Sequence, residues 1–224
     1  MSFTRYAVYY LPTDRDLAES GARWLGWDVE KGGASIQPDI PGLDDITMTP
    51  RKYGFHGTLK PPFRLAAGQS ADQLQAAVAM LARSCQPATS GGLDLRVLGG
   101  FLALVPTGDT TGIARVAANS VQAIDPFRAP PGEAELASRR KAGLTARQET
   151  LLAQWGYPYV MEEFRFHLTL TGRLPDAEIG PWAALAGEHL GPLPDSFHLD
   201  SIALVGERAT DGHFELIQRY TLTG

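Results

Sequence analysis

The sequence predicts an α+β fold of two pseudo-symmetric lobes, each an antiparallel sheet with helices packed outside, around a central cleft. Two observations lead to this prediction: strand-like segments alternate with amphipathic helical segments, and their order occurs twice. Each half runs helix, strand, helix and β-hairpin, and each of the two strands contains a His-x-Thr pattern. We therefore expect a single domain, with one lobe at about residues 1–106 and the other at about 107–224.

The first half begins with a strand and a helix. Residues 5–12 are rich in aromatic and β-branched residues and end in proline, which is typical of a strand. Residues 13–27 predict a helix with Thr13 placed to cap it. Residues 34–50 contain three prolines and many small polar residues, so we expect a loop there. A strand follows at 52–65, and its proline pair should stop it.

Residues 70–85 form the clearest helical pattern of the chain. Ser70 and Gln73 are spaced as a capping box, and leucine and valine follow at helical intervals. Residues 93–106 then predict two short strands around a glycine turn.

The second half repeats this order. Residues 110–124 predict a helix, 164–174 a strand, and 176–190 a helix that tolerates an internal proline. Residues 199–222 predict a β-hairpin, with Asp211-Gly212 in its turn.

Residues 125–160 have no counterpart in the first half and are interpreted as an insert. Thr145 and Gln148 predict a capping box and a helix through Trp155. The insert also carries Arg128, Arg139, Arg140 and Lys141. The simplest interpretation of the last three is a solvated helix face. The alternative is that they form, together with Arg128, part of a lid over a phosphate.

Composition narrows the class of protein. The 224 residues are 44% hydrophobic and 20% charged, which is typical of an ordinary globular protein. The net charge of −5 argues against binding of duplex nucleic acid through a broad positive surface. The single cysteine, Cys85, excludes an internal disulfide and a multi-cysteine metal site, and we expect it to be buried. With no leader-like or membrane-spanning apolar run, we expect a cytoplasmic monomer without membrane contact.

The two H-x-T strands share more than the motif. Residues 55–59 read Phe-His-Gly-Thr-Leu and residues 166–170 read Phe-His-Leu-Thr-Leu. Alternate residues of a strand project to the same face, so His56 lies beside Thr58, and His167 beside Thr169. If a twofold relation joins the lobes, these four side chains surround one cleft.

That set of side chains suits in-line displacement at a phosphodiester. An imidazole titrates near neutral pH, so one histidine can act as a base while the other, protonated, acts as an acid. Threonine hydroxyls can donate to non-bridging phosphate oxygens without adding charge. The sequence leaves open which histidine takes which part.

The paired motifs resemble those of the 2H phosphoesterase superfamily, which includes RNA 2′,3′-cyclic phosphodiesterases also described as 2′–5′ RNA ligases. The resemblance implies that His56 and His167 are catalytic, that Thr58 and Thr169 bind the phosphate, and that neither metal nor cofactor is needed. The insert and the opening of the chain are most similar to a bacterial branch found alongside phosphonate-utilisation genes. A place in phosphonate metabolism is therefore expected from the resemblance.

Other interpretations of the histidines remain. Either motif alone could be an ordinary half-buried strand. A zinc site is a weaker alternative, because no third ligand stands at a suitable spacing, although Glu162 and Glu163 precede His167. The remaining histidines are expected at the surface; they are His189, His198 and His213.

Four further residues are candidates for substrate binding: Lys60, Arg165, Arg128 and Tyr9. Lys60 and Arg165 each stand two residues from a motif member, so they are either solvated strand ends or cations that hold the phosphate. Tyr9 could stack on a base or pack in the core.

Three functions fit the sequence. The first is a phosphoesterase acting on a small cyclic phosphate or nucleotide. The second is an enzyme that processes short RNA ends, and the third is a phosphate-binding module without turnover. The net charge favours a small phosphorylated substrate over long RNA, but the base, sugar and leaving group are left open.

Overall fold

The computed structural model describes residues 3–141 and 143–224. Seven strands form one sheet in the order β11-β10-β1-β4-β8-β7-β6, and every neighbouring pair is antiparallel. The predicted α+β class with antiparallel strands is confirmed. The strands of this sheet are β1 (Phe3–Tyr10), β4 (Gly57–Phe63), β6 (Leu93–Leu98), β7 (Phe101–Pro106), β8 (Leu168–Thr169), β10 (Ser201–Arg208) and β11 (Phe214–Thr221).

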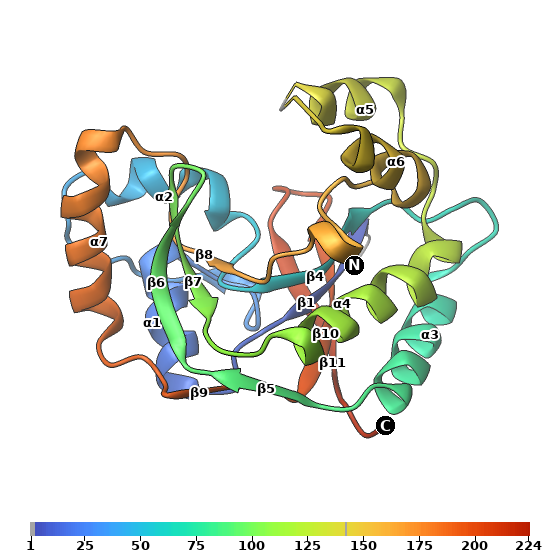
Figure 1. Cartoon of the computed structure of the whole chain (residues 1–224), viewed down its shortest axis with the longest axis horizontal. Coiled ribbons are helices and arrows are strands. Elements are labelled where there is room, and N and C mark those ends of the chain that lie inside the picture. Colours follow the sequence, from blue (N-terminus) through green and yellow to red (C-terminus); the bar gives the residue numbers. More distant parts are fainter. Residues whose placement is uncertain (1–2, 142) are drawn as a thin grey trace.

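The two halves of the chain share this sheet. The H-x-T strands β4 and β8 are neighbours at its middle. The β6–β7 hairpin of the first half lies beside β8 of the second, and the β10–β11 hairpin of the second half lies beside β1 of the first. The expected division into two separate sheets is therefore not confirmed, because strands of both halves meet in one sheet (Figure 1).

Helices and sheet together enclose the main hydrophobic core. On the strands, this core takes alternate residues such as Val8, Leu59, Leu104 and Leu168, all at most 1% exposed. The opposite side of β1 contributes Ala7 and Tyr9 to a second, smaller cluster. The helices that contribute buried residues to the main core are α1 (Arg15–Leu25), α2 (Leu43–Arg51), α3 (Ala71–Ser84), α4 (Thr111–Ile124) and α7 (Asp176–Leu190).

Shorter elements connect these parts. Figure 1 shows α5 and α6 standing apart from the other helices, beyond the middle of the sheet. Both belong to the 125–160 insert. The short elements are β2 (Trp27–Asp28), β3 (Gly33–Ala34), β5 (Ala88–Gly91), β9 (Ser196–Leu199), α5 (Glu133–Arg140), α6 (Ala146–Trp155) and the 3₁₀ turns at Asp125–Phe127 and Met161–Glu163.

Local sequence signals account for several helix boundaries. Both predicted capping boxes are confirmed: Ser70 with Gln73 begins α3, and Thr145 with Gln148 begins α6. The predicted cap of the first helix is wrong by one residue, because the carboxylate of Asp14 accepts from the backbone N–H at the start of α1. Cys85 is buried, as expected.

Helix α2 occupies part of the segment predicted as a loop. The helix includes Pro50, which has no N–H to donate to the carbonyl of Ile46 four residues earlier. The backbone N–H of Gly172 takes that place at 2.6 Å. A donor from a distant segment thus permits a proline that, from the sequence, argued against a helix.

The two H-x-T strands also differ from their predicted lengths. Strand β4 continues through Pro61 and Pro62 to Phe63, so the proline pair does not stop it. The register with β1 shifts at this point, which marks a β-bulge. Proline is tolerated at a bulge because the ladder needs fewer backbone N–H donors there. Conversely, the strand predicted over 164–174 is reduced to β8, two residues long.

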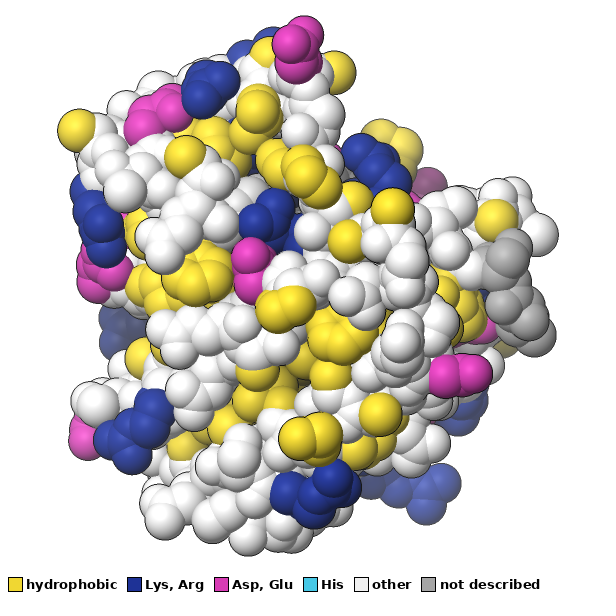
Figure 2. All heavy atoms as spheres, turned by 90° about the vertical axis from the view of Figure 1, so that its right-hand side faces the viewer, with side chains coloured by type: hydrophobic (Ala, Val, Ile, Leu, Met, Phe, Trp, Pro, Cys, Tyr) yellow, Lys and Arg dark blue, Asp and Glu magenta, His cyan; other side chains and the backbone are white. Residues whose placement is uncertain are grey.

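The surface carries mixed charge on the side of the molecule that Figure 2 presents. Lys and Arg side chains are scattered there among hydrophobic and uncharged groups. Within residues 3–141 and 143–224, none of the helices combines the length and the apolar character needed to cross a bilayer.

Candidate functional site

One cavity of about 660 Å³ gathers all four side chains of the paired motif. Thr58 reaches it from β4 and Thr169 from β8, and His56 and His167 each stand directly before the strand of their own motif. Tyr9, on the neighbouring strand β1, lines it as well. The fold thus brings together, from positions more than 100 residues apart in the chain, the side chains that the sequence predicted would share a cleft.

The register of β4 and β8 explains this convergence. The middle residues of the two motifs, Gly57 and Leu168, are Cα partners across the strands. In an antiparallel ladder, this pairing sets the histidine of each motif opposite the threonine of the other. The two imidazoles are then diagonal neighbours, for which a spacing of about 7–8 Å is typical. A tetrahedral phosphate fits between groups at that separation.

Packing between the motifs requires glycine at the centre of the first one. A Cβ atom added to Gly57 would lie 2.3 Å from Cζ of Phe166. Phe166 is itself held by edge-to-face contact with Tyr10 and by Phe197. The residue before one histidine therefore fills the space beside the other, which locks the two motifs together.

Both histidines are oriented in the same way. Nδ1 of His56 lies 2.9 Å from the carbonyl oxygen of Gly54, and Nδ1 of His167 lies 2.8 Å from that of Arg165. A carbonyl can only accept, so Nδ1 carries the proton in the neutral ring and Nε2 is left as an acceptor. Nε2 of His56 is 3.0 Å from Oγ1 of Thr58, which can donate to it.

The surroundings of the two rings differ. His56 stacks on Tyr9 with ring centroids 3.7 Å apart and planes inclined by 22°. Burial lowers the pKa of His56 to about 4. The hydrogen bond to the Gly54 carbonyl acts to raise this pKa, and the charge of His167 acts to lower it further. Burial also lowers the pKa of His167, and the Arg165 carbonyl opposes that shift. Both shifts favour the neutral form of the rings.

Cations outnumber carboxylates around the cavity. Arg5, Arg139 and Arg165 line it, and among the described lining residues Glu163 is the one carboxylate. Arg165 is exposed and stands beside His167, where the sequence suggested a phosphate-binding cation. A locally positive cavity in a chain of net charge −5 favours an anionic ligand.

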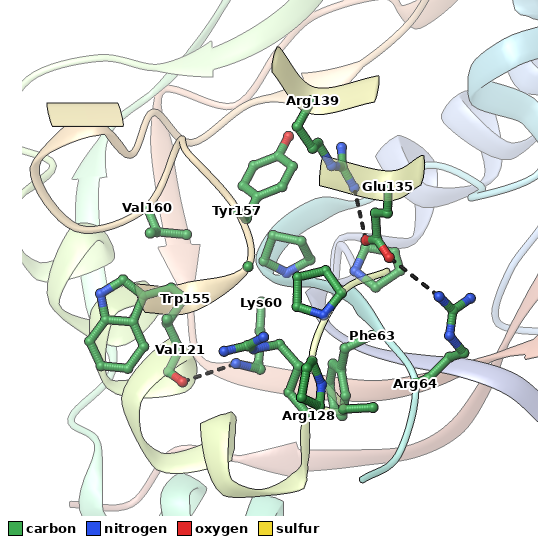
Figure 3. A pocket seen from close by; sticks show the side chains of 16 residues that line it. Lys60, Phe63, Arg64, Val121, Arg128, Glu135, Arg139, Trp155, Tyr157 and Val160 are labelled. Carbon is green, nitrogen blue, oxygen red and sulfur yellow. Dashed lines mark hydrogen bonds and ion pairs between the residues drawn. The ribbon is translucent and has the colours of Figure 1, made fainter. Parts of the chain in front are cut away.

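Lys60 does not face this cavity, contrary to the expectation from alternation. Tyr9 pairs with Thr58 but Val8 pairs with Lys60, so β4 carries one extra residue between these pairs. This bulge turns Lys60 towards α4, where its side chain is 2% exposed and Nζ donates to the carbonyl of Val121 at 3.0 Å (Figure 3). Burial lowers the pKa of Lys60 to about 8, and Asp125 partly offsets that shift.

Arg128 is likewise directed away from the paired motif. Its guanidinium donates to Asp125 at 2.8 Å and to the carbonyl of Gln154 at 3.2 Å. With Lys60 it lines a separate cavity of only about 20 Å³ (Figure 3). Arg128 therefore does not face the paired motif, because Asp125 holds its guanidinium in an ion pair.

The other cations of the insert are divided between two environments. Arg139 lies over the ring of Tyr157 at 4.7 Å, and both residues line the large cavity. Arg140 pairs with Glu149 at the surface, as expected of a solvated helix face. The insert thus contributes Arg139, rather than the whole basic cluster, to the site.

Arg5 and Tyr53 are two of the lining residues that sequence reasoning missed. Arg5 lies four residues before Tyr9 on the same face of β1, and alternation along that strand could have indicated it. Strand alternation through residues 52–65 would place Tyr53 on the face opposite His56, but Tyr53 lines the cavity. It precedes the start of β4, and Gly54 with φ 71° turns the chain between them, so strand alternation does not apply.

No cluster of three or more His, Cys, Asp or Glu side chains suited to a metal ion is found within the described ranges of the chain. His189 bonds to the carbonyl of Ser20, and His198 to the hydroxyl of Ser196, both outside the cavity. His213 packs against Trp27. These three histidines belong to other parts of the fold.

Comparison with known proteins identifies the family. The family DUF1045, described as a protein of unknown function, matches residues 58–215, which is well over half of the chain. The chain belongs to the DUF1045 family. The matched range begins at Thr58 and contains the whole second motif.

Two curated relatives of this DUF1045 chain share a name. The chain is 41% identical over 183 residues to "Ribose 1,5-bisphosphate phosphokinase PhnN" of Janthinobacterium sp. (strain Marseille), which covers 79% of the chain and 40% of that relative. It is 36% identical to the protein of the same name from Laribacter hongkongensis (strain HLHK9), over 83% of the chain and 44% of the relative. The chain therefore spans less than half the length of these relatives.

Three solved structures are among those that the DUF1045 chain resembles. E. coli LigT complexed with 3′-AMP has a TM-score of 0.45 and 15% identity, over 100% of both chains. A structure described as a phosphoesterase has a TM-score of 0.46 and 12% identity, also over 100% of both chains. The protein TT0787 of Thermus thermophilus has a TM-score of 0.48 and 15% identity, over 98% of each chain. Because these TM-scores are low, function is inferred below from the side chains of this chain itself.

Proposed function

We propose that this DUF1045 protein is a metal-independent phosphoesterase that hydrolyses a small cyclic phosphate or phosphodiester, of the 2′,3′-cyclic nucleotide or ribose cyclic phosphate type. One observation carries the proposal. Two imidazoles in one cavity each have Nδ1 fixed on the carbonyl two residues earlier, which leaves each Nε2 as the reactive nitrogen. This matched pair is what in-line displacement at phosphorus needs.

The reaction can be written with these groups alone. Nε2 of the neutral imidazole takes a proton from water as the water oxygen forms a bond to phosphorus. The bond from phosphorus to the leaving ester oxygen breaks, and the second imidazole, protonated on Nε2, gives its proton to that oxygen. The products are a phosphomonoester and a free hydroxyl group. The Nδ1–H bonds to backbone carbonyls stabilise the ring that becomes positive.

The surroundings of the rings support different parts for them. His56 has the lower pKa, about 4, and already accepts a hydrogen bond at Nε2. We assign it the part of general base. His167 is next to the exposed end of the cavity at Arg165, and a bound phosphate anion would stabilise its protonated form. We assign it the part of general acid.

The remaining side chains hold the phosphate. Thr58 and Thr169 lie in register with the histidines across β4 and β8. The hydroxyl of Thr169 can donate to a non-bridging oxygen, and that of Thr58 can do so once a phosphate oxygen replaces Nε2 of His56 as its acceptor. The guanidinium of Arg165 can balance the charge that gathers on those oxygens in the transition state.

The names of the relatives favour a sugar phosphate as substrate. Both relatives are named for ribose 1,5-bisphosphate, a phosphorylated ribose, although this chain spans only 40% and 44% of them. We include a ribose cyclic phosphate, and with it a place in phosphonate metabolism, in the proposal on that basis. Short RNA ends are the weaker candidate, because the net charge of −5 favours a small substrate over a long nucleic acid.

A substrate screen with paired variants tests the proposal. The purified protein should hydrolyse at least one of a panel of 2′,3′-cyclic nucleotides, ribose cyclic phosphates and short RNAs with cyclic ends, with or without EDTA. His56→Ala and His167→Ala should each lower kcat by roughly 10²–10⁴. The double variant should be scarcely slower than the worse single one, because the two groups act as a unit.

The pH profile separates the two histidines. Substituting the base should remove the dependence on the acidic side of the optimum, and substituting the acid should remove it on the basic side. Phosphates that bind in calorimetry without any turnover would favour the binding module. Loss of activity in EDTA, restored by one metal, would overturn the metal-independent mechanism.

A further inference from the structure

We propose that the cavity contains a second anion-binding subsite, formed by the Tyr9 hydroxyl and the Arg5 guanidinium, so that the substrate carries a second anionic group such as a phosphomonoester. The inference rests on the proposed function, which places the reacting phosphate between the two H-x-T motifs. It adds that the natural substrate is a doubly phosphorylated molecule.

The hydroxyl of Tyr9 is the first observation. The side chain is 0% exposed and lines the cavity, yet its hydroxyl oxygen has no hydrogen-bond partner within residues 3–141 and 143–224. Its ring is occupied: His56 stacks on it, and Phe214 lies 5.9 Å away. Stacking on a nucleobase, one of the uses expected from the sequence, is therefore blocked. A buried hydroxyl without a partner is costly and uncommon, and a bound ligand would satisfy it.

Arg5 provides the cation. It lies on the same face of β1 as Tyr9 and lines the same cavity. Its Nε donates to Glu207 at 2.7 Å, and Nη2 donates to the other oxygen of that carboxylate. This two-point contact fixes the plane of the guanidinium, while Nη1 has no partner in the part of the chain that the structure describes. Burial raises the pKa of Tyr9, and the charge of Arg5 acts against that rise.

The charge of this end of the cavity is positive. Glu207 neutralises Arg5, but Lys52 lies nearby with Nζ 4.7 Å from the ring centroid of Tyr53, another lining residue. Burial acts to raise the pKa of Glu207, but hydrogen bonds from Arg5 and Thr4 and the charge of Lys52 together lower it. Arg5 is thus paired with Glu207, and Lys52 adds a second positive charge that acts on the same carboxylate. A phosphate suits hydrogen-bond donors in a positive setting.

The position of this subsite has a consequence for catalysis. Antiparallel pairing of Gly57 with Leu168 relates the two motifs by a local twofold axis, so a small cyclic phosphate could bind between them in either of two orientations. Tyr9 pairs with Thr58 and stacks on His56, so the second anion binds on the side of the first motif. Anchoring it there selects one orientation, in which the two histidines keep distinct parts.

Calorimetry with matched ligands tests the subsite without requiring turnover. The ligand pairs are adenosine 3′-monophosphate with adenosine 3′,5′-bisphosphate, and ribose 1-phosphate with ribose 1,5-bisphosphate. Wild-type protein should bind the bisphosphate of at least one pair roughly 10- to 100-fold more tightly, the range for added hydrogen bonds to a charged group. Tyr9→Phe and Arg5→Met should each lose most of that preference and keep the affinity for the monophosphate.

Thermal unfolding distinguishes binding from structural support. Tyr9→Phe keeps the ring stacked on His56 and removes a hydroxyl without a partner, so its Tm should be unchanged or higher. Tyr6→Phe, on the other face of the same strand, is the matched control and should keep the ligand preference. Equal affinity of the wild-type protein for both members of each pair, or a preference that survives both cavity variants, would overturn the subsite.

Kinetics separate this inference from the proposed function. If adenosine 2′,3′-cyclic phosphate and its 5′-phosphorylated form are hydrolysed with the same kcat/KM, the proposed phosphoesterase activity is supported and the second subsite is refuted. A bisphosphate preference in calorimetry, lost in Tyr9→Phe, without turnover of any cyclic phosphate would keep the subsite and refute the enzyme. Absence of both binding and turnover would refute both.

Discussion

Substituting Gly57 by alanine tests the packing that holds the two motifs together. The added Cβ would lie 2.3 Å from Cζ of Phe166, whereas ordinary contact begins at 3.4 Å. The strands must therefore separate by about 1 Å, because Phe166 has little freedom to move between Tyr10 and Phe197. Gly57 is paired with Leu168 at the centre of the site, so the separation acts directly on the catalytic geometry.

The expected effects on stability and activity differ in size. Overpacking of this kind costs about 1–3 kcal/mol of unfolding free energy. A displacement of about 1 Å between reacting groups can cost roughly 100-fold in rate. We therefore expect Gly57→Ala to remain folded at 25 °C and to lose about 100-fold in kcat/KM.

Gly206→Ala is the matched control. Its Cβ would lie 2.4 Å from Cγ of Phe3, a similar clash in the same sheet but outside the cavity. Urea denaturation should show comparable losses of stability for both variants, while kcat/KM should fall only for Gly57→Ala. Adding Phe166→Leu to Gly57→Ala removes the ring atoms that clash and should recover part of the activity. Equal activity of the two glycine variants would refute the reasoning.

Two further predictions concern ionisable groups. In the folded protein the pKa of His56 is lowered from 6.5 to about 4, so between these pH values the unfolded chain binds a proton that the folded chain does not. Protonation therefore favours unfolding as the pH falls. The unfolding free energy of the wild-type protein, measured by urea denaturation, should fall by about 2 kcal/mol more than that of His56→Gln between pH 8 and pH 5. Equal pH dependence in both proteins would contradict the shift. Lys60→Met should leave kcat/KM unchanged and cost little stability, because Asp125 still has Arg128 as an ion-pair partner. Asp125→Asn should lower the unfolding free energy more, by about 3–5 kcal/mol, because it leaves the buried Lys60 ammonium without a carboxylate. A folded Lys60→Met protein with reduced kcat/KM would return Lys60 to substrate binding.

The sequence was sufficient where a local pattern has a local cause. The capping boxes that begin α3 and α6 are formed by side chains three residues apart, so no tertiary information was needed. The convergence of the two motifs was also predictable, because His56 and His167 occupy equivalent places in a repeated order of elements. A repeat constrains long-range geometry in a way that a single motif does not.

The sequence failed where a distant contact or a register shift decides the outcome. Lys60 follows Thr58 by two residues, which predicts a shared face, but a bulge against β1 sends its ammonium to Asp125 instead. Helix α2 depends on Gly172, which donates to a carbonyl that Pro50 cannot serve. Neither event leaves a signal in the residues nearby. The lobe boundaries at 106 and 107, the monomeric state and the cytoplasmic location stay predictions.

A duplicated site raises the question of how two equal motifs divide unequal tasks. The backbone gives both histidines the same orientation, through carbonyls two residues earlier, and the same threonine neighbour across the strands. Their differences come from elements outside the repeat. Strand β1 stacks Tyr9 on His56 and burial lowers the pKa of that ring, while Arg165 stands two residues before His167 and lines the same cavity. In the proposed mechanism, the paired motifs supply the two imidazoles, and the side chains that differ around them assign base and acid.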